Sequence, residues 1–332
     1  MEKASATSYT AQPETFDSLK VYWRQSGQGL RWDCLFVLPA WLKVWWHHFG
    51  NGSKPFVLSI SSEDRLLGIA PTRIKGDTVQ FLGDASVCDY LDFVVCPERV
   101  EDFYRVILHH LKKRGIRRLA LEAVREDSST YTDLLPLARQ MGYPVKCESQ
   151  DVSFEMRLPN QWDEYIGNLN GKERHEIRRK LRRLDEAGRM NFRLVDQRTA
   201  LESEMDTFLM LFRSNRKDKA GFMSDRMSAF FRDLAVSFSK ERILKIFFLE
   251  MDAKPAAAVM CFDYQSTRYL YNNGYDQQYR PLSVGTISKV LSIKEGIRSK
   301  KKMFDFLKGS ERYKHRLGGK PVAIYRCEVE IR

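Results

Sequence analysis

The chain has 332 residues, of which 43% are hydrophobic and 30% charged, and its formal net charge is +12. This composition excludes an intrinsically disordered chain, and the length suits two domains of ordinary size. The charge is uneven, because residues 1–150 hold 19 Lys and Arg against 18 Asp and Glu, whereas residues 151–332 hold 36 against 25. An anionic partner is therefore expected at the second half.

The cysteines and the apolar segments argue against a metal-binding protein and against a membrane protein. The six cysteines show no Cys-x-x-Cys pair and no histidine partner at zinc-ligand spacing, so we expect reduced, mostly buried thiols and no metal site. They are Cys34, Cys88, Cys96, Cys147, Cys261 and Cys327. No segment reaches the ~18 apolar residues of a membrane span, and the N-terminus lacks the apolar core of a signal peptide. We expect a cytoplasmic protein without a membrane span, with a disordered tail at residues 1–14.

Along the first half, the hydrophobic pattern predicts antiparallel strands that lead into a strand–helix–strand unit. The predicted elements are strands at 56–60, 66–74, 78–82 and 89–95, a helix near 101–114 and a strand at 117–123. Phe103, Ile107 and Leu111 share one face of that helix, as expected for a helix that packs on a sheet.

A mostly helical stretch follows, and we place the domain boundary just before it, near 148–152. Its predicted elements are a helix that begins at residues 159–160, a charged helix at 171–188, a strand at 190–195, and helices near 200–213 and 224–240.

The rest of the second half repeats the element order of the first. The repeated elements are strands at 243–251, 256–264 and 268–275, a helix near 284–299 and a strand at 302–307. Strand 89–95 matches residues 269–275 at an offset of 180 residues. Each half is therefore predicted to form a mixed, mostly antiparallel sheet flanked by helices, in the α/β (α+β) class, with domains at 15–150 and 151–332.

The two strand-to-helix loops differ in charge. Such loops bind ligands because free backbone N–H groups and the helix dipole point there. In the first half, Glu98, Glu101 and Asp102 surround the helix start and would repel a phosphate. In the second half, no acidic residue lies between 277 and 294. The predicted diphosphate site there consists of Arg280, Ser283, Val284, Gly285 and Thr286, although these residues suit an ordinary capped helix start equally well.

The segment RYLYNNGYDQQYRPLSVGTISKVLSIKEGI, followed by MFDFLKGSERYKHRLG, resembles the GNAT acyltransferase superfamily. More narrowly, it resembles the tandem-GNAT branch. That branch includes the Fem-type peptidoglycan-bridge aminoacyltransferases and the acetyltransferases associated with cellulose and exopolysaccharide biosynthesis. LLGIAPTRI, FLGDASVCDYLDF and KERHEIRRKLRRLDEAG resemble the same branch, so the resemblance covers roughly residues 30–330. The superfamily's pyrophosphate signature, Gln/Arg-x-x-Gly-x-Gly/Ala, keeps Arg280 and Gly285 but has Ser283 at the middle glycine.

The resemblance implies that the second domain binds acetyl-CoA or another acyl-CoA and that the first domain shapes the acceptor side. The strand 270–275 would offer backbone N–H groups to the acyl carbonyl, with residues 272–274 as its irregular point. Asn273, Gly274 and Tyr275 thus join the predicted donor-binding residues. Tyr313 matches the tyrosine that often protonates the departing thiolate. It precedes Gly318 by five residues rather than the usual four, and a packing role for this side chain is the alternative.

The candidate proton acceptors are less specific. Asp89 and Asp92 are three residues apart on a predicted strand, so they should point to opposite faces, and one could reach the space between the domains. Asp305 and Glu311 lie near the presumed donor site. Buried acids in such places can have a raised pKa suited to proton transfer. We name Asp89, Asp305 and Glu311 as candidate catalytic acids or bases and Asp92 as a candidate substrate-binding residue, although each also suits an ion pair with an arginine.

The charged helix at 171–188 admits two interpretations. Ile177, Leu181 and Leu184 form an inward stripe, so a solvated amphipathic helix explains much of the pattern. The excess of basic residues, with Arg178 and Arg182 as candidate substrate-binding residues, would also attract coenzyme A or a charged acceptor. The helix has no aromatic residue, which argues against sequence-specific DNA binding.

We therefore predict an enzyme that transfers an acyl group, in particular acetyl, from acyl-CoA to a small-molecule amine, such as an amino sugar or polysaccharide precursor. The main alternative hypothesis is a Fem-type transferase that uses aminoacyl-tRNA. A third hypothesis is a non-catalytic tandem module that only binds anions.

Overall fold

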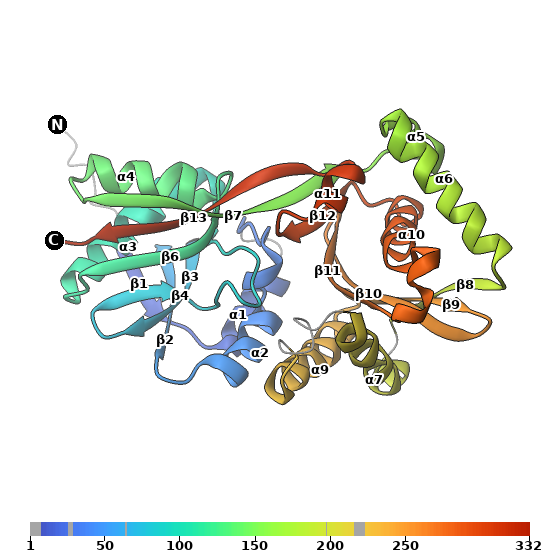
Figure 1. Ribbon diagram of the computed structural model, residues 1–332. Coiled ribbons are helices and arrows are strands. Elements are labelled where there is room, and N and C mark those ends of the chain that lie inside the picture. The colour runs from blue at the N-terminus through green and yellow to red at the C-terminus, as the bar shows by residue number, and fades with distance from the viewer. Residues whose placement is uncertain (1–7, 26–28, 64, 197, 216–222) are drawn as a thin grey trace. The chain divides into compact units, whose positions relative to one another are not determined.

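The computed structural model describes residues 8–25, 29–63, 65–196, 198–215 and 223–332 (Figure 1). The chain divides into two compact units: unit 1 is Met1–Val152 with Val322–Arg332, and unit 2 is Ser153–Pro321. The break after Val152 lies within one continuous strand, β7 (Val145–Arg157), rather than in a linker. Residues 322–332, which we assigned to the second domain, group with unit 1 because the last strand, β13 (Lys320–Glu330), pairs there with β6 (Arg118–Arg125).

Unit 1 contains a mixed sheet. In sheet order, its strands are β1 (Tyr9–Pro13), β2 (Lys54–Ser62), β3 (Arg65–Lys75), β4 (Thr78–Phe81), β6, β13 and β7. Neighbours from β1 to β4 are antiparallel, β4 and β6 are parallel, and β6 and β13 are antiparallel. The short strand β5 (Val94–Val95) pairs with β3.

The helices of unit 1 each bury one apolar face, as the spacing of their apolar residues predicts. They are α1 (Phe16–Arg24), α2 (Pro39–Phe49), α3 (Val100–Lys113) and α4 (Leu135–Gln140), with short turns of helix at Leu35–Val37, Pro97–Arg99 and Thr130–Leu134. On α3, Phe103, Ile107 and Leu111 are buried, which confirms the predicted inward face. Trp41 and Trp45 of α2 are buried in the same way.

Two predictions about unit 1 are wrong. Tyr9–Pro13 forms β1, which pairs with β2, so the expected disordered tail is not found at residues 8–14, while residues 1–7 lie outside the described residues. Cys147 of β7 and Cys327 of β13 form a disulfide, so these two thiols are not reduced. Their strands are neighbours in the sheet, which brings the Cα atoms of two residues 180 positions apart in sequence to a separation of 4.2 Å. The other four cysteines are free and buried.

The repeat also has a different register from the one we predicted. Of residues 89–95, only Val94 and Val95 form a strand, because the apolar residues before them pack as a buried loop. β4 is the strand parallel to the one that follows α3, just as β11 (Thr267–Tyr275) is parallel to β12 (Met303–Lys308) around α10 (Val284–Arg298). The counterpart of β11 is therefore β4, not residues 89–95.

Unit 2 has the predicted order of elements, with boundaries shifted by a few residues. In sheet order, its strands are β7, β12, β11, β10 (Lys254–Tyr264), β9 (Leu244–Met251) and β8 (Met190–Val195). Its helices are α5 (Trp162–Asn168), α6 (Gly171–Glu186), α7 (Arg198–Asn215), α9 (Asp225–Lys240), α10 and α11 (Arg312–Arg316), with a short turn of helix, η4, at Gln277–Leu282. None of the helices in the described part of the chain has both the length and the apolar character needed to cross a bilayer.

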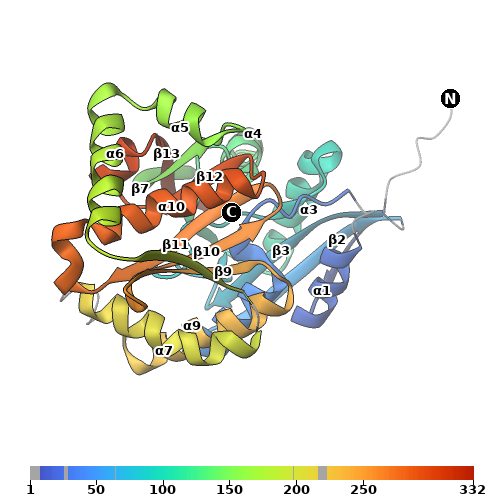
Figure 2. The same cartoon turned by 90° about the vertical axis from the view of Figure 1, so that its right-hand side faces the viewer.

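The helices of unit 2 cover both faces of its sheet. Figure 2 shows α7 and α9 on one face of β9–β11, and α10 with α6 on the other. On the α10 face, buried residues of α6, β9, β10 and α10 form one core cluster, in which Leu184 packs with Val284 and Ile287. Leu181, Tyr279 and Leu282 are half-buried against this cluster, so α6 lies beside the start of α10.

On the opposite face, Gly274 of β11 lets α7 approach the sheet. A Cβ atom at Gly274 would lie 2.3 Å from the Phe212 backbone nitrogen and 2.5 Å from the Leu211 carbonyl oxygen. These atoms belong to backbone and cannot rotate away, so the contact requires glycine.

We expect Gly274→Ala to destabilise unit 2 by about 3 kcal/mol, because the added methyl group must push α7 off the sheet. Urea unfolding followed by tryptophan fluorescence would show a lower midpoint with an unchanged slope. Gly167→Ala in α5 is the matched control, since nothing lies within 4 Å of its Cβ position. An unchanged midpoint for Gly274→Ala would contradict the close approach of α7.

Candidate functional site

In unit 2, β11 and β12 pair only at their beginnings. The parallel pairing joins residues 267–269 to residues 303–305 and, within the described residues, extends no further. Beyond this point β11 stays paired with β10 as far as Tyr275, whereas β12 stays paired with β7 as far as Lys308. The sheet therefore opens between β11 and β12 beyond Tyr269 and Asp305.

A bulge on each strand marks the opening. On β11, Met260 of β10 faces Asn272 and Cys261 faces Leu270, so Tyr271 is the extra residue. The irregular point thus lies one residue before the predicted 272–274, and Gly274 instead serves the contact with α7. On β12, the pairing with β7 shifts between Asp305 and Leu307. Bulges bend a strand and increase its twist, which explains why the two strands separate here.

Asp305 stabilises the bulge of β12. Leu307 has a left-handed backbone, with φ at +62°, and its N–H donates to Oδ1 of Asp305 at 2.7 Å. Asp305 is only 2% exposed. This contact gives the carboxylate a structural task, and its role as a proton acceptor stays a prediction.

The opening leads to the start of α10. Asp276 caps η4 by accepting the Gln278 N–H, and Ser283 then connects η4 to α10 with a left-handed backbone at φ +58°. That conformation is unusual for serine and ordinary for glycine, so Ser283 takes the conformation that the middle glycine of the GNAT signature would supply. The Ser283 hydroxyl makes no capping hydrogen bond to the first turn of α10. Instead, the Ser283 carbonyl accepts the N–H groups of Thr286 and Ile287.

The start of α10 has little steric bulk and no negative charge. Gly285 lies directly against Tyr275, since a Cβ atom there would be 2.6 Å from the ring. The first turn contains no acidic residue, and the exposed Arg280 precedes it. In the first turn of α3, by contrast, Glu101 and Asp102 are present. The N-terminus of α10 can therefore accept an anion, and that of α3 already carries its own carboxylates.

α6 places basic side chains beside this region. Arg178 and Arg182 are exposed, and Arg182 has a long contact of 3.8 Å with Glu186. Glu176 is held by Arg179 and Lys180, and hydrogen bonding from Arg179 lowers the pKa of this carboxyl to about 2. Some of the charge on α6 is thus neutralised within the helix, while the side chains of Arg178 and Arg182 are exposed at its surface.

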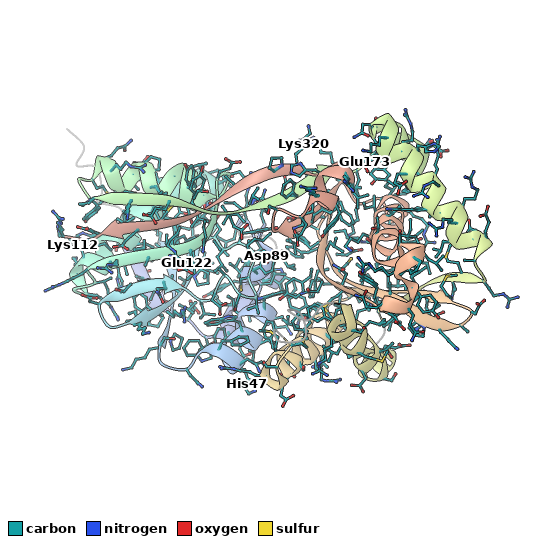
Figure 3. The ribbon with its side chains drawn as sticks, in the orientation of Figure 1. His47, Asp89, Lys112, Glu122, Glu173 and Lys320 are labelled. Carbon is teal, nitrogen blue, oxygen red and sulfur yellow. A yellow bond between two sulfur atoms is a disulfide. The ribbon has the colours of Figure 1, made fainter. Side chains whose placement is uncertain are left out.

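α11, which follows β12, holds Tyr313 close to α10. The ammonium group of Lys289, on α10, lies 4.8 Å from the centre of the Tyr313 ring, and the Phe306 ring lies 6.4 Å from it. α11 is also tied to α6, because Arg316 lies 3.7 Å from Glu173, labelled at the beginning of α6 in Figure 3. Tyr313 is half-buried. Tyr313, the predicted proton donor, thus lies on α11, next to α10, and α10 begins at the predicted phosphate loop.

Lys314 is a residue of this region that the sequence did not single out. It is 1% exposed, and its Nζ donates to the carbonyl oxygens of Leu307, Lys308 and Gly309 at 2.5–3.1 Å. Glu311 forms an ion pair with the Lys314 ammonium group at 3.0 Å. A lysine in a run of charged residues normally predicts a solvated side chain, so the sequence carries no signal for this burial. Glu311 itself is exposed and paired, and its catalytic role stays a prediction.

The two remaining candidates, Asp89 and Asp92, belong to unit 1, where Figure 3 labels Asp89 in the loop before β5. Both oxygens of Asp92 accept hydrogen bonds from Ser129 and Thr130, at the start of the Thr130–Leu134 helix. Burial is the main cause of its raised pKa. Asp92 therefore caps a helix within unit 1. Its role in substrate binding, like that of Asp89 in catalysis, stays a prediction.

The chain is similar to known proteins in part of its sequence and in its fold. The model of the acetyltransferase (GNAT) domain matches residues 171–315, which include α6, β11, α10, β12 and Tyr313. Among solved structures, FemX has a TM-score of 0.67 at 11% identity, with 97% of each chain covered. A tandem GNAT protein from the clavulanic acid biosynthesis pathway has a TM-score of 0.52 at 11% identity, covering 96% of this chain and 98% of that one.

A third similar structure is the C-terminal domain of a putative lysylphosphatidylglycerol synthetase from Agrobacterium fabrum. Its TM-score is 0.54 at 13% identity, covering 82% of this chain and 80% of that one. No curated protein sequence matches the chain. The acetyltransferase (GNAT) domain model thus matches most of unit 2, and the chain has the fold of FemX and of the tandem GNAT protein, in agreement with the predicted fold class.

We expect Gly285→Ala to destabilise unit 2 by about 1–3 kcal/mol, because the new methyl group would overlap the Tyr275 ring. Adding Tyr275→Ala should recover much of this loss, and urea unfolding of the single and double variants would measure the coupling. Gly171→Ala, at the first residue of α6, is the control, since its Cβ position is 3.9 Å from the nearest side-chain atom. Strictly additive effects of the two substitutions would contradict the contact.

Proposed function

We propose that this protein is an N-acyltransferase that moves an acyl group, in particular acetyl, from acyl-CoA to an amine. The observation that carries the proposal is the separation of β11 from β12 beside an acid-free helix start. A thioester lying along the opening could meet backbone N–H groups of residues 270–275, while its diphosphate reached the first turn of α10. The GNAT domain match over residues 171–315 supports the same assignment.

The donor end of the reaction needs positive charge without competing carboxylates. Coenzyme A carries phosphates, and the free N–H groups of Val284 and Gly285 come first in α10. Arg280, Arg178 and Arg182 would add charge from neighbouring elements. These residues have the chemistry that a diphosphate requires, and we assign donor binding to them.

The reaction itself requires two proton transfers. The amine nitrogen attacks the thioester carbonyl carbon, the carbon–sulfur bond breaks, and a base takes the proton that the amine loses. The departing thiolate receives a proton, which we assign to the Tyr313 hydroxyl because α11 places this side chain next to α10. Asp305 and Glu311 are the candidate bases in unit 2, and Asp89 is the candidate in unit 1.

The acceptor that we propose is an amino sugar or a precursor of an envelope or secreted polysaccharide. This assignment rests on the resemblance of the sequence to acetyltransferases associated with such pathways. We assign acceptor binding to unit 1, with Asp92 as its candidate residue.

A second candidate function is aminoacyl transfer from aminoacyl-tRNA. The similarity to FemX over 97% of the chain favours it about as much as the similarity to the tandem GNAT protein favours acyl-CoA. Both donors are activated acyl groups on polyanionic carriers, so the basic surface of α6 suits either. The affinity for tRNA should fall more steeply with salt than the affinity for coenzyme A, because a tRNA contacts many more basic groups.

We expect Thr286→Glu to weaken acetyl-CoA binding about tenfold, since it adds a carboxylate at the third position of α10. Asp102 occupies the same position in α3. The same change should leave the free protein as stable or slightly more stable, because glutamate is favoured there by capping. Isothermal titration with acetyl-CoA and thermal unfolding without it would measure the two effects.

Thr286→Gln is the isosteric control and should bind acetyl-CoA like the natural protein. Equal affinity of both variants would exclude a phosphate site at α10. Binding of aminoacyl-tRNA that weakens steeply with salt, together with no thermal shift from acetyl-CoA, would favour the second candidate function.

We expect Tyr313→Phe to lower kcat for acetyl transfer about 100-fold with little change in KM, because it removes the proton donor and keeps the ring. Steady-state release of free thiol from acetyl-CoA would measure this loss. Tyr165→Phe is the control, since the Tyr165 hydroxyl donates to the Leu317 carbonyl at 3.2 Å and should affect stability alone. Coenzyme A binding without turnover, and no loss in Tyr313→Phe, would favour a non-catalytic module.

A further inference from the structure

The charged side chain of Lys289 is buried in the second turn of α10 and is 7% exposed. Burying an ammonium group is costly unless partners stabilise it. Its Nζ donates to the Gly285 carbonyl at 2.6 Å and lies 4.8 Å from the centre of the Tyr313 ring. Lys289 therefore joins the first turn of α10, where we place the donor phosphates, to the tyrosine that we propose as the acid.

A cation over an aromatic face fixes the orientation of the ring. A positive charge about 5 Å away also favours the ionised form of a phenol over the neutral form. Both effects would matter for a tyrosine that must give its proton to a thiolate. The ring of Phe306 limits Tyr313 from the β12 side, so α10 and β12 together restrict its position.

We propose that Lys289 is a positioning residue for Tyr313: its ammonium group orients the phenol and makes the hydroxyl a stronger acid toward the departing thiolate. The catalytic part of this proposal rests on the proposed acyltransferase function. The electrostatic part concerns only the two side chains and can be tested without turnover.

Other charged groups near Tyr313 have partners of their own. Lys314 is directed to the carbonyls of residues 307–309 and to Glu311, and Arg316 pairs with Glu173 of α6. The remaining charged or titratable groups on α11 and at the end of β12 are Arg312, His315 and Lys308, and the His315 ring packs against Phe154. Lys289 also has a partner, the Gly285 carbonyl, and its ammonium group lies over the face of the Tyr313 ring.

The decisive measurement is the ionisation of Tyr313, followed by NMR of ¹³Cζ-labelled tyrosine with the Tyr313 signal assigned by its loss in Tyr313→Phe. We expect Lys289→Met to raise the pKa of Tyr313 by about one unit. Lys289→Gln, which keeps an N–H donor for the Gly285 carbonyl, should give the same shift if Lys289→Met folds poorly. An unchanged pKa of Tyr313 in a folded variant would overturn the proposal.

The matched control is Lys294→Met, because Lys294 lies on the same helix and over another ring, that of Trp162, at 5.6 Å. It should leave the Tyr313 ionisation and kcat unchanged. In acetyl transfer, we expect Lys289→Met to lower kcat about tenfold, with KM for acetyl-CoA within about twofold. In a Tyr313→Phe background, the same substitution should cause no further loss, whereas a merely structural role would add its own loss.

The two readouts separate the two proposals. Absence of acyl transfer by the natural protein, with a shifted Tyr313 pKa in Lys289→Met, would refute the proposed function and leave the electrostatic pairing intact. Acyl transfer that Lys289→Met slows equally in the presence and absence of the Tyr313 hydroxyl would refute the positioning role and leave the proposed function intact.

Discussion

The organisation of unit 2 depends on one constraint, which is that β11 pairs fully with β10 but only briefly with β12. β11 acquires extra twist because it bulges at Tyr271. β12 has its own shift in register after Asp305 and stays paired with β7. The two strands must therefore diverge. Gly274 lets α7 pack tightly on the far side of β11 and so holds the diverging strand in place.

The function of the opening between β11 and β12 depends on the helix that begins beside it, α10. α10 begins there with small residues and no carboxylate, whereas the corresponding helix of unit 1, α3, begins with two acids. The helix dipole is the same in both, so the side chains of the first turn decide which helix can receive an anion. α11 and α6 then contribute Tyr313 and exposed arginines from neighbouring positions. Of these two corresponding helix starts, that of α10 is the one suited to an anion.

Much of unit 2 could be predicted because its signals are local. The strand and helix periods identified β8–β12 and α10, and the absence of acids between residues 277 and 294 identified the candidate loop. The errors arose where distant segments decide the outcome. The buried loop before β5 has the composition of a strand but packs as core, and the true counterpart of β11, β4, is recognised only from its parallel pairing with β6. Lys289 and Lys314 look like surface residues in sequence, because neighbours from other elements supply the acceptors that bury them.

Local sequence patterns were enough to predict the two-domain α/β organisation, the uneven charge and the contrast between the two helix starts, because hydrophobic period and side-chain charge act over a few residues. Three features became visible only in the folded protein: the pairing of β7 with β13, the disulfide between Cys147 and Cys327, and the burial of cations near Tyr313. These features depend on sheet pairing and helix packing between residues far apart in the chain. No local pattern specifies such contacts, because each side chain's environment is set by elements that only the folded sheet brings to it.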